Sequence, residues 1–339
     1  MKTLLALDSF KGCLTASEAV EAAASALPCG QAVSLPLSDG GEGFTDCLVS
    51  ALGGTYRSVT VHDPIGRPVK VEYGLVHHGR TAVIETAAAS GITCLKESER
   101  NPLIASSFGT GEIIKDALEQ GVEQIYIGLG GTATMDCGTG LLKALGALPP
   151  SVRIHAFYDV DIPLMDAPAL FGPQKGADGT AILELERRFL LQRMEWKSVF
   201  GVDANLLPGA GAAGGIGAAL SVCLGATMHE GIDAVLEAVR FPERLEGCGL
   251  VITGEGKADR QTLTGKVPFG VLQATRRFAP GTPVVLLAGK VEDREALREA
   301  GFDAILQITP EDQLNGNYLE KSLAMENLRH TVLSLQNQD

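Results

Sequence analysis

Residues 3–12 read TLLALDSFKG, a short apolar run that ends in an acidic loop with a glycine. A run of this length, bounded by turn residues, predicts a buried β-strand. Residues 15–27 follow, and they open with Thr15-Ala16-Ser17-Glu18, in which the side chains of Thr15 and Glu18 can cap each other's backbone N–H groups. The chain therefore begins with a strand, a polar loop and a helix.

The same order recurs after residue 30 and again near the far end of the chain. Strands that alternate with helices predict a parallel sheet, whose loops at the carboxyl ends of the strands form the site. We therefore expect an α/β fold with a doubly wound domain built from residues 1–55 and 241–339. The further apolar runs are residues 32–37, 250–253, 284–288 and 304–308.

The middle of the chain has a different pattern. Apolar runs at residues 57–61, 69–76 and 81–85 are separated by short turns, which predicts a local antiparallel arrangement. Helices also occur there, such as residues 112–120. We expect residues 56–240 to form an inserted mixed α/β domain, with the ligand in the crevice between the two domains.

Charge and cysteine content exclude several classes of protein. The 339 residues include 28 Lys+Arg and 41 Asp+Glu, giving a net charge of −13, so general affinity for nucleic acid is not expected. Seven cysteines without a CxxC pair indicate reduced thiols and a cytoplasmic protein. Residues 208–228 lack charges but are rich in Gly and Ala, which indicates a loop and a buried helix and not a membrane span.

Four loops combine glycines with carboxylates, hydroxyls or a lysine: residues 8–12, 39–43, 130–136 and 254–259. Phosphoryl transfer needs this mixture, because N–H groups and lysines stabilise phosphate oxygens while Asp or Glu holds Mg²⁺. Glycine-flanked lysines could supply a local positive field to an anionic ligand inside an acidic protein. They are Lys11, Lys175, Lys257, Lys266 and Lys290.

Other catalytic motifs are weak or absent. Residues 209–214 read GAGAAG and fit the GxGxxG dinucleotide pattern, but Pro208 precedes them and no clear strand leads into them. A nicotinamide-dependent hydroxyacid dehydrogenase is therefore an alternative that depends on this one motif. His155 lies in an apolar run, so we expect it to be a packed core residue and not a base.

The glycine loops and several neighbouring segments together resemble the bacterial glycerate kinase type 1 family. The resemblance implies ATP- and Mg²⁺-dependent phosphorylation of D-glycerate, usually on the 2-hydroxyl, and a Rossmann-like domain with an inserted second α/β domain. The motifs that carry it are DSFKG at residues 8–12, PLSDGGEG at 36–43, NPL at 101–103, FGTGE at 108–112, GLGGTAT at 128–134, FGPQKG at 171–176, PGAGAAGGIG at 208–217 and TGEGK at 253–257.

Three departures from the family pattern matter. In this chain, Met135 replaces the Asn and Cys137 replaces a Gly of the family's GGSATNDGG loop. Ile162 replaces the Asn of the family's DVDNPL segment. A stretch that normally follows residues 145–147 is missing. Altered substrate choice, reduced catalysis, or a catalytically silent protein that binds glycerate or a nucleotide are therefore alternatives.

Site roles are assigned by residue type within these loops. We expect a protein that acts on glycerate and ATP as a monomer or homodimer, without nucleic acid or membrane partners. Asp136 or Asp161 would position the attacking hydroxyl, and Lys11 would complete the catalytic set. Substrate contacts are assigned to Asp8, Ser9, Lys11, Thr132 and Thr134, phosphate or nucleotide contacts to Gly130, Gly131, Gly209, Gly211, Gly214, Gly215 and Lys257, and Mg²⁺ to Asp39, Glu42 and Asp259.

Overall fold

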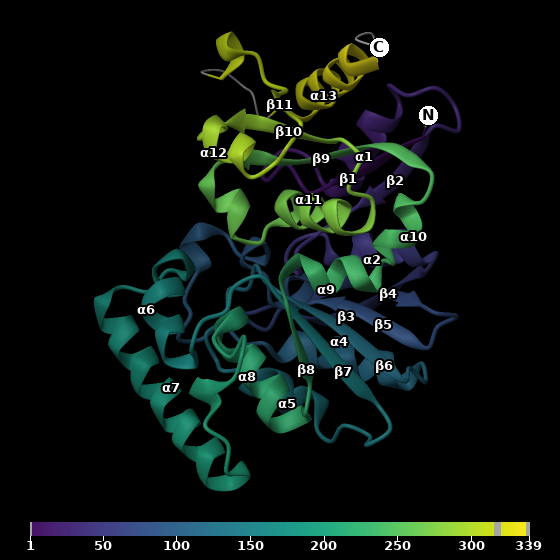
Figure 1. Cartoon of the computed structure of the whole chain (residues 1–339). Helices are drawn as coiled ribbons and strands as arrows, with labels where there is room; N and C mark the ends of the chain where they lie inside the picture. Colours follow the sequence, from purple (N-terminus) through teal and green to yellow (C-terminus); the bar gives the residue numbers. More distant parts are fainter. Residues whose placement is uncertain (1, 315–319, 337–339) are drawn as a thin grey trace. The chain divides into compact units, whose positions relative to one another are not determined.

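A computed structural model describes residues 2–314 and 320–336 of the chain (Figure 1). The chain divides into two compact units. The first unit contains the residues up to Asp39 and those from Ile232 onward, and the second is Gly40–Gly231. Both units are α/β, which confirms the predicted fold class.

The first unit is built on a five-stranded sheet in the order β11-β10-β9-β1-β2. All of its strand pairs are parallel. Both ends of the chain thus contribute to one parallel sheet, as the sequence predicts. The strands are β1 (Lys2–Leu7), β2 (Ala32–Pro36), β9 (Cys248–Ala258), β10 (Val284–Val291) and β11 (Ala304–Gln307).

Helices cover both faces of this sheet (Figure 1). Helices α1 (Ala16–Ala24) and α13 (Lys321–Gln336) pack together over a core that includes Leu5, Leu7 and Leu287. The opposite face contacts α11 (Val267–Phe278). The expected capping box is present, since the Glu18 N–H donates to Thr15 Oγ1 over 3.2 Å and the Thr15 N–H donates to Glu18 Oε2 over 3.1 Å. The unit also contains α9 (Gly231–Ala238), α10 (Phe241–Leu245) and α12 (Arg294–Glu299).

The second unit is built on a six-stranded sheet in the order β3-β4-β5-β6-β7-β8. Strands β3 to β5 pair antiparallel, whereas β5 to β8 pair parallel. This mixed sheet agrees with the antiparallel pattern predicted for the middle of the chain. The strands are β3 (Thr55–His62), β4 (Pro68–Val76), β5 (Thr81–Glu85), β6 (Gln124–Leu129), β7 (Arg153–Tyr158) and β8 (Thr227–Glu230).

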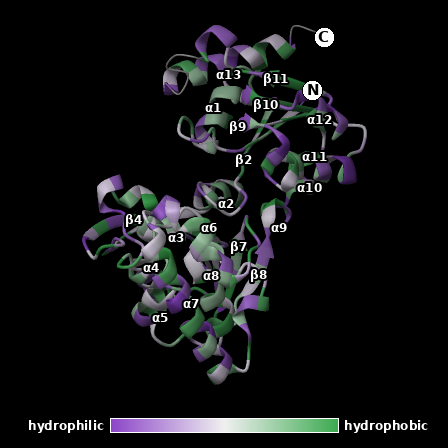
Figure 2. Cartoon of the chain, turned by 90° about the vertical axis from the view of Figure 1, so that its left-hand side faces the viewer, coloured by the Kyte–Doolittle hydropathy of each residue, from purple (hydrophilic) through white to green (hydrophobic). Residues whose placement is uncertain are grey.

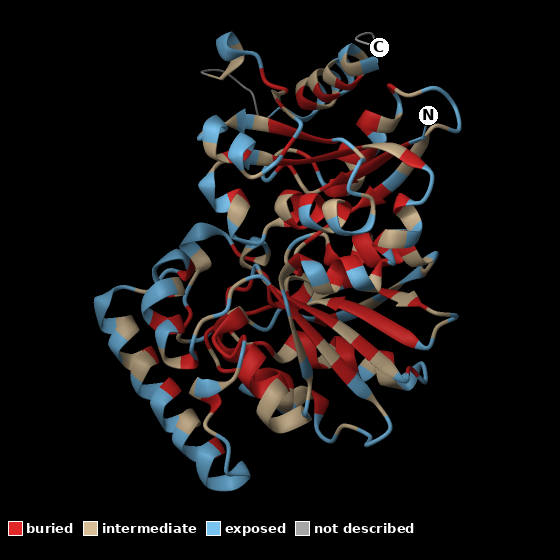
Figure 3. Cartoon of the chain, in the orientation of Figure 1, coloured by how far each residue is buried: buried red, intermediate tan, exposed pale blue. Residues whose placement is uncertain are grey.

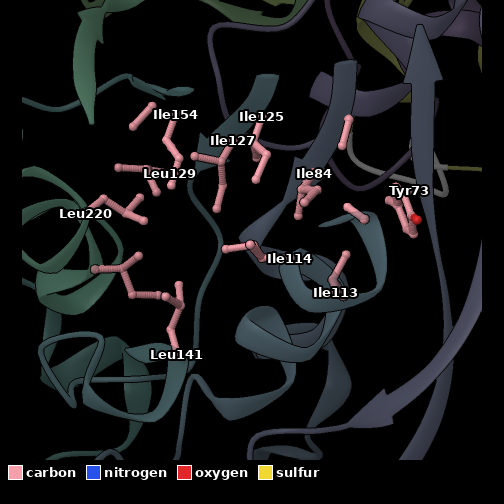
Figure 4. Close-up of a cluster of buried hydrophobic side chains, with 14 of the residues drawn as sticks. Tyr73, Ile84, Ile113, Ile114, Ile125, Ile127, Leu129, Leu141, Ile154 and Leu220 are labelled. Atoms are coloured by element: carbon pink, nitrogen blue, oxygen red, sulfur yellow. The ribbon is translucent and has the colours of Figure 1, made fainter. Parts of the chain in front are cut away.

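A large apolar cluster lies between this sheet and the helices α4 (Phe108–Glu119), α5 (Thr139–Leu145) and α8 (Ala212–Leu224) (Figure 4). It joins Ile125 and Ile127 of β6 to Ile113 and Ile114 of α4 and to Leu141 of α5. Helix α2 covers the other face, where Gly74 and Gly128 allow its Val49 and Phe44 side chains to approach the strands. The helices are α2 (Phe44–Leu52), α3 (Thr86–Ser90), α4 (Phe108–Glu119), α5 (Thr139–Leu145), α6 (Ala167–Phe171), α7 (Gly179–Phe200) and α8 (Ala212–Leu224).

Two details differ from the sequence predictions. The compact units divide after Asp39 and Gly231, and not near residues 55 and 240, because α2 packs on β4 and β5 of the second sheet. The assignment of a Rossmann-like domain to residues 1–55 and 241–339, and of an inserted domain to residues 56–240, stays a prediction. Residues 254–257, expected as a loop, continue β9, because Gly254 allows the carbonyl of Leu287 in β10 to come close.

The sequence predicts neither a membrane span nor a disulfide framework. In the described part of the chain, no helix is both long enough and apolar enough to cross a membrane. Helix α8, which holds most of the uncharged segment, is a buried helix of the second unit, as predicted. All seven cysteines are free thiols.

Substitution of Ile127 tests how much the apolar cluster of the second unit stabilises the chain. Its side chain is fully buried in β6, between β5 and β7, so Ile127→Ala should lower the free energy of unfolding by about 2–5 kcal/mol. The control Leu170→Ala alters an exposed side chain and should change stability by less than about 0.5 kcal/mol. Urea unfolding followed by circular dichroism measures both, and equal losses would contradict the packing described.

Candidate functional site

The first candidate site lies at the carboxyl edge of the first sheet. Leu7, the last residue of β1, pairs with Pro36 of β2 on one side and with Gly254 of β9 on the other. The loops that follow β1 and β2 therefore start beside Glu255, and the Asp8 N–H donates to the Gly254 carbonyl over 2.9 Å. We call Asp8, Asp39, Glu255 and Asp259 the acidic cluster.

Burial and the charges of neighbouring carboxylates disfavour the charged forms of Asp8 and Glu255. The pKa of Asp8 lies well above its usual value, first because of burial and then because of the charges of Asp39 and Glu255. Burial also raises the pKa of Glu255, with further contributions from Asp259 and Asp39. The Thr262 hydroxyl donates to Glu255 over 2.5 Å and Lys266 Nζ lies 3.7 Å from its other oxygen, and both contacts oppose that rise.

Lysines beside the acidic cluster are paired or exposed. Lys257 Nζ, expected to bind phosphate, lies 3.1 Å from Asp259 and 3.0 Å from Glu292. Asp259 also caps the short helix Arg260–Thr264 through the Gln261 N–H. Lys11 is exposed, and Gly256 allows its backbone to come close to β9. The Ser9 N–H donates to the Asp8 carboxylate over 2.6 Å, which lowers the pKa of Asp8 in part.

The acidic cluster offers carboxylate oxygens, the ligands that a divalent cation prefers. Among residues 2–314 and 320–336, no three His, Cys, Asp or Glu side chains are arranged to hold a metal by themselves. Mg²⁺ usually takes one or two carboxylates, with water and substrate phosphates as its other ligands. A cation would offset the repulsion that raises the pKa of Asp8, so the residues present suit it.

The second candidate site follows β6 in the second unit. Lys175, only 4% exposed, donates from Nζ to the Thr134 carbonyl over 2.9 Å and to Thr132 Oγ1 over 3.2 Å. Thr134 is fully buried, and its Oγ1 has no hydrogen-bond partner. The negative charge of Asp136 lies close enough to Lys175 to raise its pKa. We call these four residues the lysine cluster.

Burial lowers the pKa of Lys175 to about 7, although the charge of Asp136 opposes this shift. A lysine whose pKa lies near neutrality is uncommon, and such groups concentrate at functional sites. The side chain was predicted only as one of five glycine-flanked lysines. The signal that could have singled it out is its place in the FGPQKG segment at residues 171–176, directly before Gly176, whose left-handed conformation turns the chain.

Asp136, a predicted catalytic residue, is held by four hydrogen bonds. Its Oδ2 accepts from the Ser107 N–H and hydroxyl, both over 2.9 Å, and from the Gly140 N–H over 3.2 Å. Its Oδ1 accepts from the Gly138 N–H over 3.0 Å. These contacts fix the start of α5 and the loop before it. The catalytic role of Asp136 stays a prediction. Four hydrogen bonds hold the carboxylate in one place, which suits a group that positions another group.

The glycines of residues 209–217 bring backbones together. A Cβ at Gly214 would lie 1.9 Å from the Thr134 carbonyl oxygen, and one at Gly215 would lie 2.9 Å from the Cα of Cys137. The Gly209 N–H donates to Asp161 Oδ1 over 2.8 Å, which ties the exposed, predicted catalytic Asp161 to this segment. These glycines, with Gly211, thus serve close packing beside the lysine cluster, and their predicted phosphate contacts stay predictions.

The remaining predicted residues fall into the second unit. Gly130 and Gly131 form the turn after β6, where the Ile92 N–H donates to the Gly131 carbonyl. Glu42, a predicted Mg²⁺ ligand, is exposed in the turn before α2. Its charge helps to raise the pKa of Glu85 to about 7, an effect caused mainly by burial. Sequence reasoning missed Glu85, which accepts from the Thr45 N–H over 2.8 Å.

A groove in the second unit lies away from these groups. It is lined by residues 146–150 before β7 and by the chain after α8, including Cys223 and Thr227. Arg153 and Thr227 begin β7 and β8, so the groove lies at the amino ends of these strands. The lysine cluster follows the carboxyl end of β6. The groove carries no acid or base pair, and we do not assign chemistry to it.

Comparisons with known proteins decide the family. The model of the glycerate kinase family matches residues 3–150 and 148–337. The chain belongs to the glycerate kinase family. It is 36% identical to the glycerate 2-kinase of Escherichia coli (strain K12) over 375 residues, covering 98% of each chain, and 39% identical to the glycerate kinase of Bacillus subtilis (strain 168) over 348 residues, covering 91% of each.

A solved structure agrees with this assignment. The crystal structure of a protein described as glycerate kinase 2 from Salmonella typhimurium LT2 matches with a TM-score of 0.85 and 36% identity, covering 100% of this chain and 98% of the other. The family match breaks at residues 148–150, where the sequence predicts a missing stretch. That loop joins α5 to the amino end of β7, so the shortening lies at the groove and not at the lysine cluster.

The family departures are also explained by packing. Met135 is 2% exposed and lies in an apolar cluster with Leu164, Phe189 and Trp196. Ile162 packs against the same cluster. The two side chains that replace amides therefore belong to or pack on one apolar cluster, and the polar groups of the lysine cluster remain in place.

Asp8 tests the acidic cluster through the pH dependence of stability. Because its pKa is raised on folding, the folded chain retains a proton that the unfolded chain loses near about pH 3.9. Stability from this group therefore falls as pH rises above that value. Asp8→Asn should raise the melting temperature relative to wild type at pH 8, with a smaller difference at pH 4.

Differential scanning calorimetry at several pH values measures the difference between Asp8→Asn and wild type. Asp312→Asn is the matched control, because Asp312 is exposed in the same unit. A destabilised Asp8→Asn protein at pH 8 would show that the Asp8 carboxylate is favourably held and would contradict the repulsion described.

Proposed function

We propose that the chain is an ATP-dependent kinase that phosphorylates D-glycerate on its 2-hydroxyl and gives 2-phosphoglycerate. The observation that carries the proposal is the buried Lys175, held beside two threonines at the end of β6, in a chain that matches a glycerate 2-kinase over 98% of its length. The seven free cysteines support a cytoplasmic location.

The lysine cluster suits an anionic oxygen of the substrate. A protonated Lys175 in a buried site interacts more strongly with an anion than a solvated lysine would. The Thr132 hydroxyl lies next to Nζ, and Thr134 Oγ1 is a buried polar group without a protein partner. We assign the substrate anion to these groups, and the hydroxyl to Asp136 or Asp161. Positioning matters more than strong basicity in a loose phosphoryl-transfer transition state.

The acidic cluster suits the metal. We assign Mg²⁺ to Asp39 and Asp259, with Glu42 as a further candidate. We add Glu255, because the charges of both aspartates raise its pKa. When bound, Mg²⁺ neutralises the negative charge of nucleotide phosphates. Asp8, Ser9 and Lys11 keep their proposed substrate contacts, and Lys257 and the glycines of residues 130–131 and 209–215 their proposed phosphate contacts.

The two alternatives have less support. A silent binding protein was motivated by the lost amides and the missing stretch, but Met135 faces an apolar core and the shortened loop lies at the amino end of β7. A dehydrogenase would need a strand leading into the GxGxxG segment. The element before Gly209 is the short helix Ala204–Leu206, and Gly214 packs on Thr134.

The central test is turnover. Purified protein with ATP, Mg²⁺ and D-glycerate should form ADP and 2-phosphoglycerate, with the phosphate position read by phosphorus NMR. Omission of Mg²⁺ or of glycerate should stop ADP formation. No turnover above a control without enzyme, together with thermal stabilisation by glycerate, would favour the silent binding protein.

Lys175 tests the site. Lys175→Met should lower kcat/KM by about 100-fold or more, because a charged donor to the substrate is removed. In the wild type, the KM for glycerate should rise as pH increases above about 7, because the amine loses its proton there. The exposed Lys143→Met in the same unit is the control and should behave as wild type.

The stability of Lys175→Met distinguishes loss of function from loss of fold. A pKa lowered on folding means that the folded chain binds fewer protons between pH 7 and pH 10.5, so the lysine lowers stability increasingly as pH falls toward 7. The variant should therefore gain more stability relative to wild type at pH 7 than at pH 10. Full activity of Lys175→Met would contradict the assigned role.

A further inference from the structure

Helix α7 (Gly179–Phe200) exposes an unusual amount of apolar surface. Twelve large hydrophobic side chains are exposed in the described part of the chain, and six of them belong to this one helix. Figure 3 shows most of α7 in the colour of exposed residues, with a few buried positions along one side. Single exposed apolar residues are normal, whereas a contiguous group indicates an interaction surface. The six are Leu183, Leu190, Leu191, Met194, Val199 and Phe200.

Three of the six exposed residues form a stripe on the side of α7 that faces away from the core. Leu185, Phe189 and Trp196 are buried in the apolar cluster of the unit. Successive residues of an α-helix are rotated by about 100°, so Leu183, Leu190 and Met194 lie within about 40° of one another on the opposite side. We call Leu183, Arg187, Leu190 and Met194 the α7 seam.

The apolar surface continues beside the seam. Arg188 donates to the Leu103 carbonyl over 2.8 Å, which places the 65% exposed Ile104 next to α7. The short helix Ala204–Leu206 packs on α7, and its Leu206 is 80% exposed. Ile104 and Leu206 are thus further exposed apolar residues in segments that contact α7.

The spacing of the seam is that of a coiled coil. Its residues alternate by four, three and four positions, which is the a and d pattern of a heptad with Leu183 and Leu190 at d and Arg187 and Met194 at a. We propose that α7 packs antiparallel on α7 of a second copy of this chain, forming a reversible homodimer with twofold symmetry.

Arg187 decides the orientation. In a parallel pair, a faces a, so Arg187 would lie against the same arginine of the other copy, and like charges would repel. In an antiparallel pair, a faces d, so Arg187 lies against Leu190 and Leu183 lies against Met194. The charge of Arg187 is already balanced within its own helix, since Glu184 accepts from its Nε over 2.8 Å.

Charges beside the seam favour the same arrangement. Glu186 and Arg193 occupy the same flanking heptad position, so an antiparallel pair brings Glu186 of one copy toward Arg193 of the other. Arg193 is also held by Asp203 of its own chain, through hydrogen bonds of 2.6 and 2.8 Å. Hydrophilic and hydrophobic residues are interspersed along α7 (Figure 2). The helix carries four basic and three acidic residues, whereas the chain has a net charge of −13, so two copies repel each other less through α7 than through an average surface.

Sedimentation velocity over a range of about 1–100 μM tests the proposal. The mass should rise from that of the 35.5 kDa chain toward twice this value with increasing concentration. Leu190→Glu with Met194→Glu should abolish the dimer, because it places charges at the apolar positions of the seam. Phe278→Glu changes an exposed aromatic residue of the first unit and should leave association unchanged.

Cysteine cross-linking tests the orientation in a Cys29→Ser background, which removes an exposed native thiol. Under oxidation, a protein carrying both Leu183→Cys and Met194→Cys should form a covalent dimer, and each single variant should not. A covalent dimer of a single variant would overturn the antiparallel arrangement. A monomer at every concentration, or a Leu190→Glu/Met194→Glu protein that folds with an unchanged melting temperature and still dimerises, would overturn the proposal.

Discussion

The position of β1 between β2 and β9 is the constraint on which the first unit depends. Parallel strands end at the same edge of a sheet, so the residues that follow them must come together. Asp8 is therefore half-buried beside the charges of Asp39 and Glu255, and loss of solvent together with these charges raises its pKa. Such repulsion lowers stability, and groups with strongly shifted pKa values concentrate at functional sites.

In the second unit, a buried positive side chain lies at the carboxyl end of a parallel strand. Strand β6 also ends inside a parallel part of its sheet, and Lys175 is buried beside the loop that follows it. Glycines make this possible, because Gly214 and Gly215 let a second backbone segment lie directly on residues 134–137. Each unit thus carries ionisable groups whose pKa is shifted toward the neutral form, Asp8 and Glu255 in the first unit and Lys175 and Glu85 in the second.

The shortened loop shows how a family fold tolerates loss of sequence. Residues 146–152 connect α5 to the start of β7, at the amino ends of the strands. Ligand groups in open α/β sheets gather at the carboxyl ends, so trimming the other edge leaves them intact. The apolar replacements Met135 and Ile162 are absorbed in the same way, by a cluster that already contains Phe189 and Trp196.

The sequence by itself determined the alternation of strands and helices, the parallel sheet from both chain ends and the loops that carry the polar groups. These follow from local periodicity and turn chemistry, which short windows contain. Only the tertiary structure decided that α2 belongs to the second sheet, that β9 runs through Gly254, and that Lys175 is buried beside Thr132 and Thr134. Burial and close backbone approach depend on residues distant in the chain, so no local pattern can encode the pKa of Lys175.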